Sequence, residues 1–394
     1  MACHWAAAAA LALVAAAPSA TTPAAASCQA ALTAACSTNA ARAHSPFAHE
    51  PCAVCAGHMQ RALKLANCSH ADIVSYCEGA PGSIPTMMTA AYKDGSCGAP
   101  FACVKTRTVP VPEPGSGEAL IRSAGSSVNP CDVDYVEGEF AGCSGGGGTL
   151  GMDVAGTVVK LGTGKCRLKV GDRVWADLGG VRGDTGGMAD YAVVGCDQAG
   201  IAPSSINVSA QQLPRLPSVP DTNCRCPQLT AAATIPLAGL TSVECLQATG
   251  APWSAPNLTV VVTSGTGGTG FIGVQLAKAF GAARVVTSTS GAGNIALAKS
   301  FGADVVTDYK KQDIFSALPD ASVDIVYDNF GAAGTADRAM RTMKHGGTIL
   351  VLPGGNGGKI SKHPRADVRQ ITFTGTRSSA HDGLDTMAAF FDAG

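Results

Sequence analysis

Hydrophobic positions follow a β pattern in the middle of the chain. From about residue 105 to residue 225, short apolar runs are separated by glycines and polar turn residues. Many short strands with turn signals between them predict a barrel-like domain. A proline-rich stretch at 211–227, which includes Cys224 and Cys226, is expected to be an insertion loop. The predicted strands are 119–122, 153–160, 171–175 and 189–194.

After residue 229 the pattern changes to an alternation of helical and strand-like segments. Such alternation at short spacing predicts an α/β fold with a doubly wound parallel sheet. The predicted helices are 229–250, 271–280, 294–301 and 336–343, and the predicted strands are 259–263, 284–289, 305–306, 323–327 and 348–352.

The first hundred residues have a third character. An apolar run at 6–17 is too short to span a membrane and precedes small residues in Ala-x-Ala order, which predicts a signal peptide over residues 1–27. Residues 28–103 combine helical spacing with dense cysteines, which predicts a small helical module held by disulfides. The pair Cys52-x-x-Cys55 could instead bind zinc or exchange electrons. The eight cysteines are Cys28, Cys36, Cys52, Cys55, Cys68, Cys77, Cys97 and Cys103.

Composition narrows the classes of partner. A formal net charge of -1 gives no electrostatic reason to expect nucleic acid or an anionic membrane. Hydrophobic residues make up 46% of the chain and charged residues 14%, which argues against disorder. No segment after the leader is long and apolar enough to be a transmembrane helix.

One glycine motif carries the strongest indication of chemistry. Residues 260–273 read VVVTSGTGGTGFIG, so a buried strand runs into glycines and then directly into a helix. Glycines allow the main chain to approach a diphosphate, and a helix N-terminus offers it free N–H groups. We therefore predict a dinucleotide site at Gly267, Gly268, Thr269 and Gly270. A glycine-rich turn without a ligand is the alternative, and a nucleoside-triphosphate loop is excluded because no Gly-Lys-Ser/Thr follows.

The end of the next strand distinguishes between nicotinamide cofactors. An NAD-specific site usually places Asp or Glu there to bind the ribose 2′-hydroxyl. This chain has Ser288, Thr289 and Ser290 at these positions. Because hydroxyls can donate to a 2′-phosphate and no carboxylate repels it, the sequence favours NADPH, although no Arg or Lys is visible at the strand end.

Several further motifs resemble those of zinc-free medium-chain dehydrogenases/reductases of the quinone oxidoreductase type, including plastid-type and reticulon-interacting relatives. The resemblance covers about residues 105–394. The motifs, in family order, are 127–132 (SVNPCD), 151–158 (GMDVAGTV), 169–174 (KVGDRV), 187–191 (GMADY), 235–241 (IPLAGLT), the glycine loop, 301–304 (FGAD), 308–310 (DYK) and 344–347 (KHGG).

The resemblance implies a GroES-like β-barrel domain over residues 105–235 and a Rossmann domain over residues 236–394. The cofactor would bind between them, and the preceding helical disulfide-rich module would be separate. Relatives continue beyond the point where this chain stops, so we expect the last barrel strands to be missing. The resemblance also implies a homodimer.

Residue types argue against a catalytic zinc ion. Zinc-dependent members of the superfamily use an early cysteine and a Gly-His-Glu motif. Here Asn129 stands at the first position, and Met152 and Asp153 stand at the second. These side chains cannot rebuild a Cys/His tetrahedral site, so we predict no metal. Cys131 and Cys143 are expected to be buried or disulfide-bonded.

Without a Lewis acid, hydride must go to an acceptor that delocalises negative charge, such as a quinone or an α,β-unsaturated carbonyl. By resemblance, Asn129 and Asp132 lie at the substrate site, and Tyr135 is a candidate proton donor whose alternative role is packing. Relatives carry a tyrosine where this chain has Phe140, which removes one candidate acid. Thr241 would face the nicotinamide ribose. Tyr309, Asn329, Leu352 and Gly354 follow strands, where this fold binds its ligand.

The expected compartment has two alternatives. The signal peptide, the cysteine module and three N-glycosylation sequons, at Asn67, Asn207 and Asn257, favour the secretory pathway. A plastid reached through a signal peptide is the second, because nicotinamide cofactors are scarce outside cells. The competing function is a secreted cysteine-rich binding protein that carries an inactive reductase-like domain.

Overall fold

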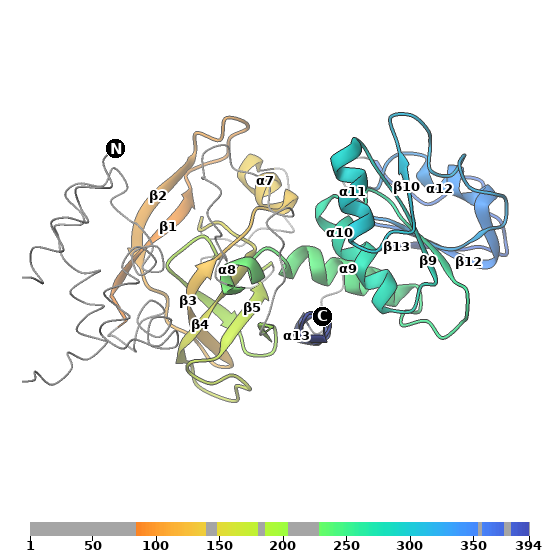
Figure 1. Cartoon of the computed structure of the whole chain (residues 1–394). Coiled ribbons are helices and arrows are strands. Elements are labelled where there is room, and N and C mark those ends of the chain that lie inside the picture. Colours follow the sequence, from red (N-terminus) through yellow and green to blue (C-terminus); the bar gives the residue numbers. More distant parts are fainter. Residues whose placement is uncertain are drawn as a thin grey trace, which may run out of the picture. The chain divides into compact units, whose positions relative to one another are not determined.

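The computed structural model describes residues 84–138, 148–179, 186–203, 228–353, 357–373 and 380–393 (Figure 1). The chain divides into two compact units, Met1–Ile84 and Pro85–Gly394, and every element below belongs to the second. The predicted signal peptide, the cysteines from Cys28 to Cys77 and the insertion loop at 211–227 lie outside the described residues.

An antiparallel five-stranded sheet forms the first half of this unit, with strand order β6-β3-β4-β5-β7. All four predicted strands are present, because alternate side chains of each are buried in one apolar cluster that includes Ile121, Val154, Val174 and Val194. The strands are β3 (Glu118–Gly125), β4 (Asp153–Leu161), β5 (Arg173–Asp177), β6 (Tyr191–Gly195) and β7 (Gly200–Ile201).

A hairpin formed by β1 (Met87–Lys93) and β2 (Val104–Pro110) places the domain boundary earlier than the sequence indicated. We expected residues 28–103 to form one module, but the hairpin is bonded to the barrel half. Ala91 N–H donates to Met188 O at 2.8 Å, and Leu150 N–H donates to Ala91 O at 2.9 Å. These main-chain bonds assign residues 85–103 to the second unit, since both partners lie far ahead in the chain.

Two disulfides join described residues of this half of the unit. Cys97 bonds to Cys103 and closes the loop of the β1–β2 hairpin, so the expected disulfide use of these two residues is confirmed. Cys166 bonds to Cys196 and links the β4–β5 connection to the turn after β6, a pairing that the sequence did not reveal. Cys131 is a free, half-buried thiol in the first turn of α7 (Pro130–Glu137).

Replacing Cys166 and Cys196 together by serine is expected to lower the free energy of unfolding by about 4 kcal/mol, because the cross-link closes a long loop in the unfolded chain. The two residues are separated by 30 positions. The matched control replaces Cys97 and Cys103, which are separated by 6 positions and should cost about 2 kcal/mol. Urea unfolding measures both losses, and a larger loss from the short loop contradicts the prediction.

Two helices connect the halves where the sequence predicted one. The stretch 229–250 forms α8 (Gln228–Ala232) and α9 (Pro236–Ala248). Pro236 lies at the first helical position of α9, where its missing N–H is tolerated. The helix therefore restarts at the proline instead of running through it.

The second half contains a six-stranded, wholly parallel sheet with strand order β10-β9-β8-β11-β12-β13. This order, reversing between β8 and β11, confirms the predicted doubly wound fold. The sequence missed only the last strand. The strands are β8 (Thr259–Val262), β9 (Arg284–Thr289), β10 (Val305–Asp308), β11 (Val323–Asp328), β12 (Met343–Val351) and β13 (Arg369–Thr372).

Alternate strand residues bury both faces of this sheet. Val260 and Val262 pack in one cluster with α9 and with α10 (Gly268–Ala279), while Val261 packs in the other with the short helix α12 (Thr335–Ala339). Helix α11 (Ala292–Ser300) contacts β9 and β10. Both faces are therefore covered, as a parallel sheet requires.

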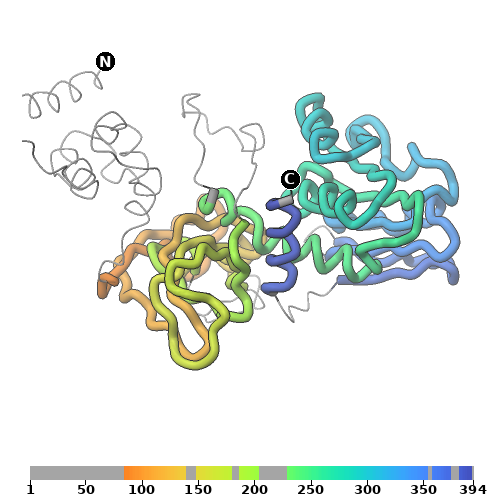
Figure 2. Tube along the Cα trace, turned by 60° about the horizontal axis from the view of Figure 1, so that its bottom comes forward, coloured from red at the N-terminus to blue at the C-terminus, as the bar shows by residue number. Residues whose placement is uncertain are grey.

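The last helix, α13 (Ala380–Ala393), contacts α9 and the antiparallel sheet (Figure 2). Its Phe391 ring meets Trp175 of β5 edge to face at 6.2 Å, and Ile201 N–H donates to Asp385 Oδ1 at 3.3 Å. This helix shares the main core with α9. None of the helices among the described residues is long and apolar enough to cross a membrane.

Candidate active site

The glycine loop joins β8 to α10 at the carboxyl edge of the parallel sheet. Gly267 is the N-cap of α10, in extended conformation with φ -77° and ψ 169°, and no side chain caps the helix. Gly265 N–H donates to Ser288 O at 2.9 Å, which fixes the loop against β9. An N-terminus without a side-chain cap leaves main-chain N–H groups of the first turn available to an anion.

The glycines of the loop have two different roles. A Cβ added at Gly270 would lie 1.9 Å from Ser264 O, and one at Gly273 would lie 2.9 Å from the Tyr327 ring. These two glycines allow the helix to pack closely on the loop and the sheet. A Cβ at Gly268 would meet nothing within 4 Å, and this residue is exposed. Gly268 therefore presents an open main-chain surface at the helix end, which fits a diphosphate.

The residues predicted to follow the strands come together along this same edge. Tyr309 N–H donates to Thr289 O at 3.1 Å, and Leu352 N–H donates to Asp328 O at 3.0 Å. The Asn329 amide donates to Thr263 O, at the start of the glycine loop. Parallel strands end at one edge, so residues far apart in sequence meet there. Gly354 lies outside the described residues.

Ser288 has a different environment from the one predicted. It is 8% exposed and its hydroxyl accepts a hydrogen bond from Ser264 N–H at 3.4 Å, so it supports the loop. Ser290 is half-buried at the end of β9, and Tyr309 is 60% exposed beside it. Of the two serines, Ser290 is the better placed to meet a 2′-phosphate.

The pairing of β9 with β10 brings the residues that follow β10 to the end of β9. In the parallel register Asp308 is opposite Thr289, so Tyr309 follows β10 at the level of Ser290, and Lys310 is the next residue in the chain. Lys310 is exposed. Lys310 belongs to the DYK motif at 308–310, which the pairing of β9 with β10 brings to the end of β9.

On the antiparallel half, Asn129 and Asp132 form the start of α7. Asn129 N–H donates to Asp132 Oδ2 at 2.8 Å, and Met152 N–H donates to Asp132 Oδ1 at 3.0 Å. Asp132 is buried, which raises its pKa, while the hydrogen bonds act in the opposite direction. Both oxygens accept main-chain donors, so Asp132 fixes the Asn129 backbone to the beginning of β4.

Asp153, whose residue type argues against a zinc site, bonds to several segments of the site. Its side chain is completely buried, and Oδ2 accepts from Ser127 Oγ at 2.5 Å and from Asn129 Nδ2 at 2.9 Å. Oδ1 accepts from Leu237 N–H at 2.7 Å, in the first turn of α9. One carboxyl group therefore connects the predicted substrate residue Asn129 with the helix that carries Thr241.

A second acid lies opposite Asp153. Asp177 is its direct cross-strand partner in the β4–β5 register and is 5% exposed. Burial raises the pKa of Asp153 to about 7, and the Asp177 charge contributes in the same direction, whereas the bonds from Ser127, Asn129 and Leu237 oppose it. In the sequence, this buried carboxyl group is indicated only by Asp153 next to Met152 within an apolar strand. The partners of the Asp153 side chain come from other segments and could not be predicted from the sequence.

Asp153→Asn is expected to flatten the pH dependence of stability. The pKa is raised on folding, so this group favours the folded state below about pH 4 and loses that contribution as the pH rises to about 7. As the pH rises, the free energy of unfolding of the variant should increase relative to that of the wild type by about 1 kcal/mol per pH unit. Between pH 5 and pH 8 this amounts to about 3 kcal/mol. Urea unfolding at both pH values tests this, and a constant difference between the two proteins contradicts it.

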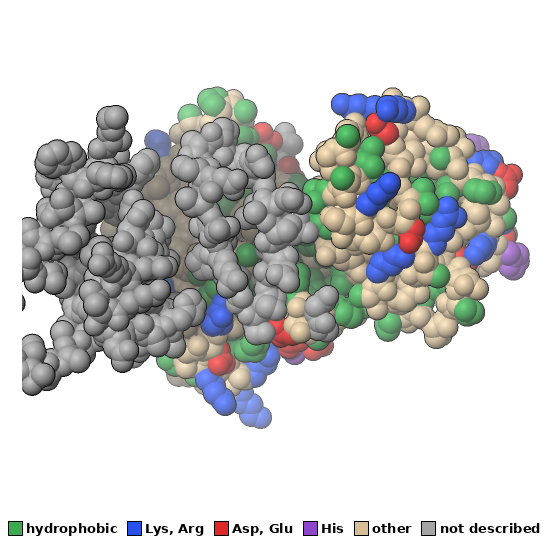
Figure 3. Space-filling model, viewed as in Figure 1, with side chains coloured by type: hydrophobic (Ala, Val, Ile, Leu, Met, Phe, Trp, Pro, Cys, Tyr) green, Lys and Arg blue, Asp and Glu red, His purple; other side chains and the backbone are tan. Residues whose placement is uncertain are grey.

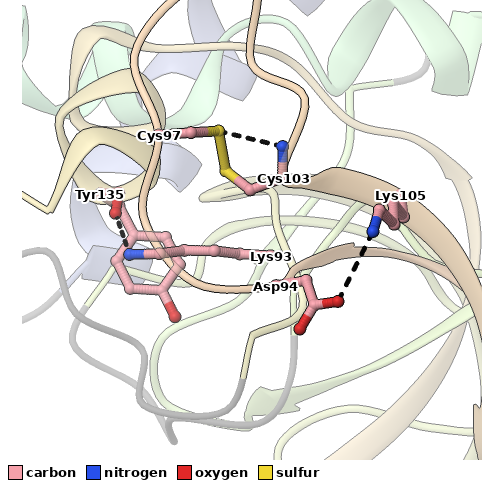
Figure 4. The surroundings of a disulfide bond; sticks show 6 residues. All are labelled: Lys93, Asp94, Cys97, Cys103, Lys105 and Tyr135. Carbon is pink, nitrogen blue, oxygen red and sulfur yellow. Dashed lines mark hydrogen bonds and ion pairs between the residues drawn. A yellow bond between two sulfur atoms is a disulfide. The ribbon is translucent and has the colours of Figure 1, made fainter.

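Tyr135 lies with a small apolar cluster that includes Cys103, Val136 and Leu150. The Lys93 ammonium is 4.3 Å from the centre of the Tyr135 ring and donates to Tyr135 O at 2.5 Å, as Figure 4 shows next to the Cys97–Cys103 disulfide. These are the contacts of a packing aromatic.

Helix α9 links the two sets of residues. Thr241 is half-buried, and its hydroxyl donates to Leu237 O at 2.8 Å, within the helix. Ser242 Oγ donates to Thr269 O at 3.0 Å, in the first turn of α10. Asp153 binds the start of α9 and Ser242 binds the glycine loop, so a single helix ties Asn129 to the proposed diphosphate site.

The residues at the zinc positions of related enzymes have other partners. Asn129 and Asp153 bond to each other, and Met152 is a buried apolar side chain 7% exposed. Within the described ranges, no group of three His, Cys, Asp or Glu side chains is arranged to hold a metal ion. On the face shown in Figure 3, charged side chains of both signs are interspersed.

Comparison with known proteins agrees with this architecture. Residues 115–217 match the family described as alcohol dehydrogenase GroES-like domain, which confirms the expected GroES-like domain, and residues 268–393 match the one described as zinc-binding dehydrogenase. A quinone oxidoreductase structure from Coxiella burnetii superimposes with a TM-score of 0.59 over 78% of this chain and 88% of that chain, at 21% identity.

Two curated relatives are similar in sequence. The 2-methylene-furan-3-one reductase of Solanum lycopersicum is 32% identical over 279 residues, covering 69% of this chain and 64% of that protein. The chloroplastic NADPH-dependent alkenal/one oxidoreductase of Arabidopsis thaliana is 30% identical over 300 residues, covering 75% of this chain and 70% of that protein. The chain thus spans about two thirds of these relatives. Further relatives are named quinone oxidoreductases, and several are named chloroplastic.

Proposed function

Because the chain belongs to the medium-chain dehydrogenase/reductase superfamily, among its zinc-free, quinone oxidoreductase-like members, we propose that it transfers hydride from NADPH to a quinone or an α,β-unsaturated carbonyl. The observation that carries this proposal is the open Gly268 at the N-terminus of α10, which has no side-chain cap. It supports a bound dinucleotide, whereas nothing among the described residues favours an inactive binding protein.

The proposed cofactor site follows the carboxyl edge of the parallel sheet. Main-chain groups of Gly267, Gly268 and Thr269 would hold the diphosphate, with Gly270 allowing the close approach of helix and loop. Ser290, Tyr309 and Lys310 would surround a ribose 2′-phosphate, and this set is the basis for proposing NADPH over NADH. Ser288 would support them from behind. The nicotinamide half would lie towards Thr241, Asn329, Leu352 and Gly354.

NADPH supplies hydride from the nicotinamide ring when it is bound. The protein's own residues would orient the acceptor and exclude water, since no Lewis acid is proposed. A quinone or enone suits such a site because it delocalises the incoming charge over its conjugated carbonyl. Asn129, held by Asp132 and Asp153, would line the site of the acceptor.

We propose the plastid as the compartment, on the names of several relatives. The secretory alternative depends mainly on residues 1–27 and on the cysteines from Cys28 to Cys77, which lie outside the described residues. Homodimer formation remains a prediction. Fusion of the full chain to a fluorescent protein tests the compartment. Fluorescence in plastids supports the proposal, and fluorescence confined to the medium or the secretory pathway contradicts it.

The experiment for the activity uses the full chain. NADPH binding is measured by fluorescence titration, and turnover by the fall in 340 nm absorbance with p-benzoquinone or trans-2-hexenal as acceptor. We expect saturable binding, tighter than that of NADH, and turnover with at least one acceptor. A folded protein that binds neither cofactor contradicts the proposal, whereas binding without turnover of either acceptor supports the inactive alternative.

A further inference from the structure

Reduction of a conjugated carbonyl requires a proton as well as a hydride, and the site as described has no clear proton source. Tyr135 lies in an apolar cluster under Lys93, and Phe140, where relatives carry a tyrosine, has no acidic proton. A buried acid with a path to the substrate residues would fill this role.

We propose that Ser127 is the proton donor to the reduced substrate and that Asp153 resupplies it as an internal acid. This inference rests on the proposed function, since it names the proton source of that same reaction. It is carried by three contacts: Ser127 Oγ to Asp153 Oδ2 at 2.5 Å, Asn129 Nδ2 to the same oxygen at 2.9 Å, and Asn129 Nδ2 to Ser127 Oγ at 3.1 Å.

The burial of neighbouring residues gives the relay a direction. Asp153 is 0% exposed, Ser127 is half-buried, and the adjacent Val128 is 71% exposed. Ser127 thus lies at the boundary between the buried carboxyl group and the surface, two residues before the predicted substrate residue Asn129. A proton held by Asp153 can leave towards that surface through the Ser127 hydroxyl.

Asp153 is surrounded by groups that control its charge. From β5, Asp177 is directly opposite and repels a second negative charge. From the start of α7, Asp132 accepts the N–H of the neighbouring Met152. From α9, Leu237 N–H donates to Oδ1 and stabilises the anion once it forms. Burial raises the pKa of Asp153 to about 7, so both protonation states are available near neutral pH.

In the proposed reaction, hydride adds to the β-carbon of an enone and leaves an enolate. The Ser127 O–H bond breaks and its proton goes to the enolate. The carboxyl O–H bond of Asp153 then breaks, and that proton restores the Ser127 hydroxyl. Asp153 remains as a carboxylate, hydrogen-bonded by Asn129 and Leu237, and takes a proton from water after the product leaves.

The test compares Ser127→Ala with Ser126→Ala in the full chain. Both hydroxyls bond to Asp153, but Ser126 Oγ donates to the main-chain oxygen, at 2.6 Å, and not to the carboxyl group. With trans-2-hexenal as acceptor, Ser127→Ala should lower kcat about 10- to 100-fold at pH 6 while NADPH affinity stays within threefold of wild type. Ser126→Ala should retain the wild-type kcat.

Measuring kcat/KM between pH 5 and pH 9 distinguishes a proton relay through Asp153 and Ser127 from a purely structural role of these residues. Wild-type kcat/KM should fall as the pH rises above about 7, because protonated Asp153 is the active form. Asp153→Asn and Ser127→Ala should both lose this descending limb. Rescue of kcat by Asp153→Glu, which restores a carboxyl group, would support the relay.

Three results overturn the inference. The first is a wild-type kcat in Ser127→Ala. The second is a pH profile of kcat/KM that still falls near pH 7 in Asp153→Asn or in Ser127→Ala. The third is an equal loss of kcat in Ser126→Ala and Ser127→Ala. Should Asp153→Asn fail to fold, Ser127→Ala alone decides, because it keeps the buried carboxyl group. A wild-type protein that binds no NADPH overturns the proposed function and this inference together, whereas bound NADPH with normal turnover in Ser127→Ala overturns the inference alone.

Discussion

Gly268→Asp is expected to weaken NADPH binding by at least about 100-fold, equivalent to about 3 kcal/mol, while the protein stays folded. The new carboxylate would occupy the open space over the first turn of α10, where we place the diphosphate, and like charges brought together there cost several kcal/mol. The fold should tolerate the change, because nothing lies within 4 Å of the added Cβ and an acidic residue is favourable in the first turn of a helix.

Fluorescence titration with NADPH and thermal unfolding of the same samples measure the two effects. Gly268→Asn is the matched control, since its side chain has nearly the same shape without the charge. It should lose less affinity than the aspartate variant and have a similar melting temperature. An aspartate variant that binds NADPH within threefold of wild type would falsify the placement of the diphosphate.

Gly270→Ala is expected to destabilise the protein by about 3 kcal/mol or more, a large effect for one methyl group. The added Cβ would lie 1.9 Å from Ser264 O, and a main-chain oxygen cannot move unless the whole glycine loop moves with it. The gain in helix propensity from glycine to alanine is only about 1 kcal/mol, so the clash decides the outcome. Loss of NADPH binding should accompany the loss of stability.

Urea unfolding gives the free energy for this comparison. Gly293→Ala is the control, because Gly293 is also in the first turn of a helix, α11, and an added Cβ would meet nothing within 4 Å. That variant should be as stable as wild type or slightly more stable. Equal stability of the two alanine variants would show that the close packing at Gly270 is not required.

Much of the fold could be predicted because its signals are local. Five of the six strands of the parallel sheet and three of its helices follow from runs of apolar residues such as 260–262 and 284–289, separated by glycine turns. The sequence missed β13, where residues 369–372 (RQIT) lack a long apolar run. It also missed the division of α8 from α9, although Pro236 was the signal for it.

The pairing of segments far apart in the chain could not be predicted in the same way. Cys166 meets Cys196 because the β4–β5 connection and the turn after β6 lie side by side. Tyr309 meets Thr289 because β10 pairs with β9. In each case one residue of the pair has no special sequence context, so only the tertiary contact reveals its partner.

The sequence by itself determined the glycine loop between strand and helix, the doubly wound sheet and the residue types at Asn129 and Met152, since each depends on residue type and short spacing. Only the tertiary structure decided the environment of Asp153. Its partners Ser127, Asp177 and Leu237 come from three separate segments, and the charge of a buried carboxyl group depends on the hydrogen bonds and the neighbouring acid that folding brings to it.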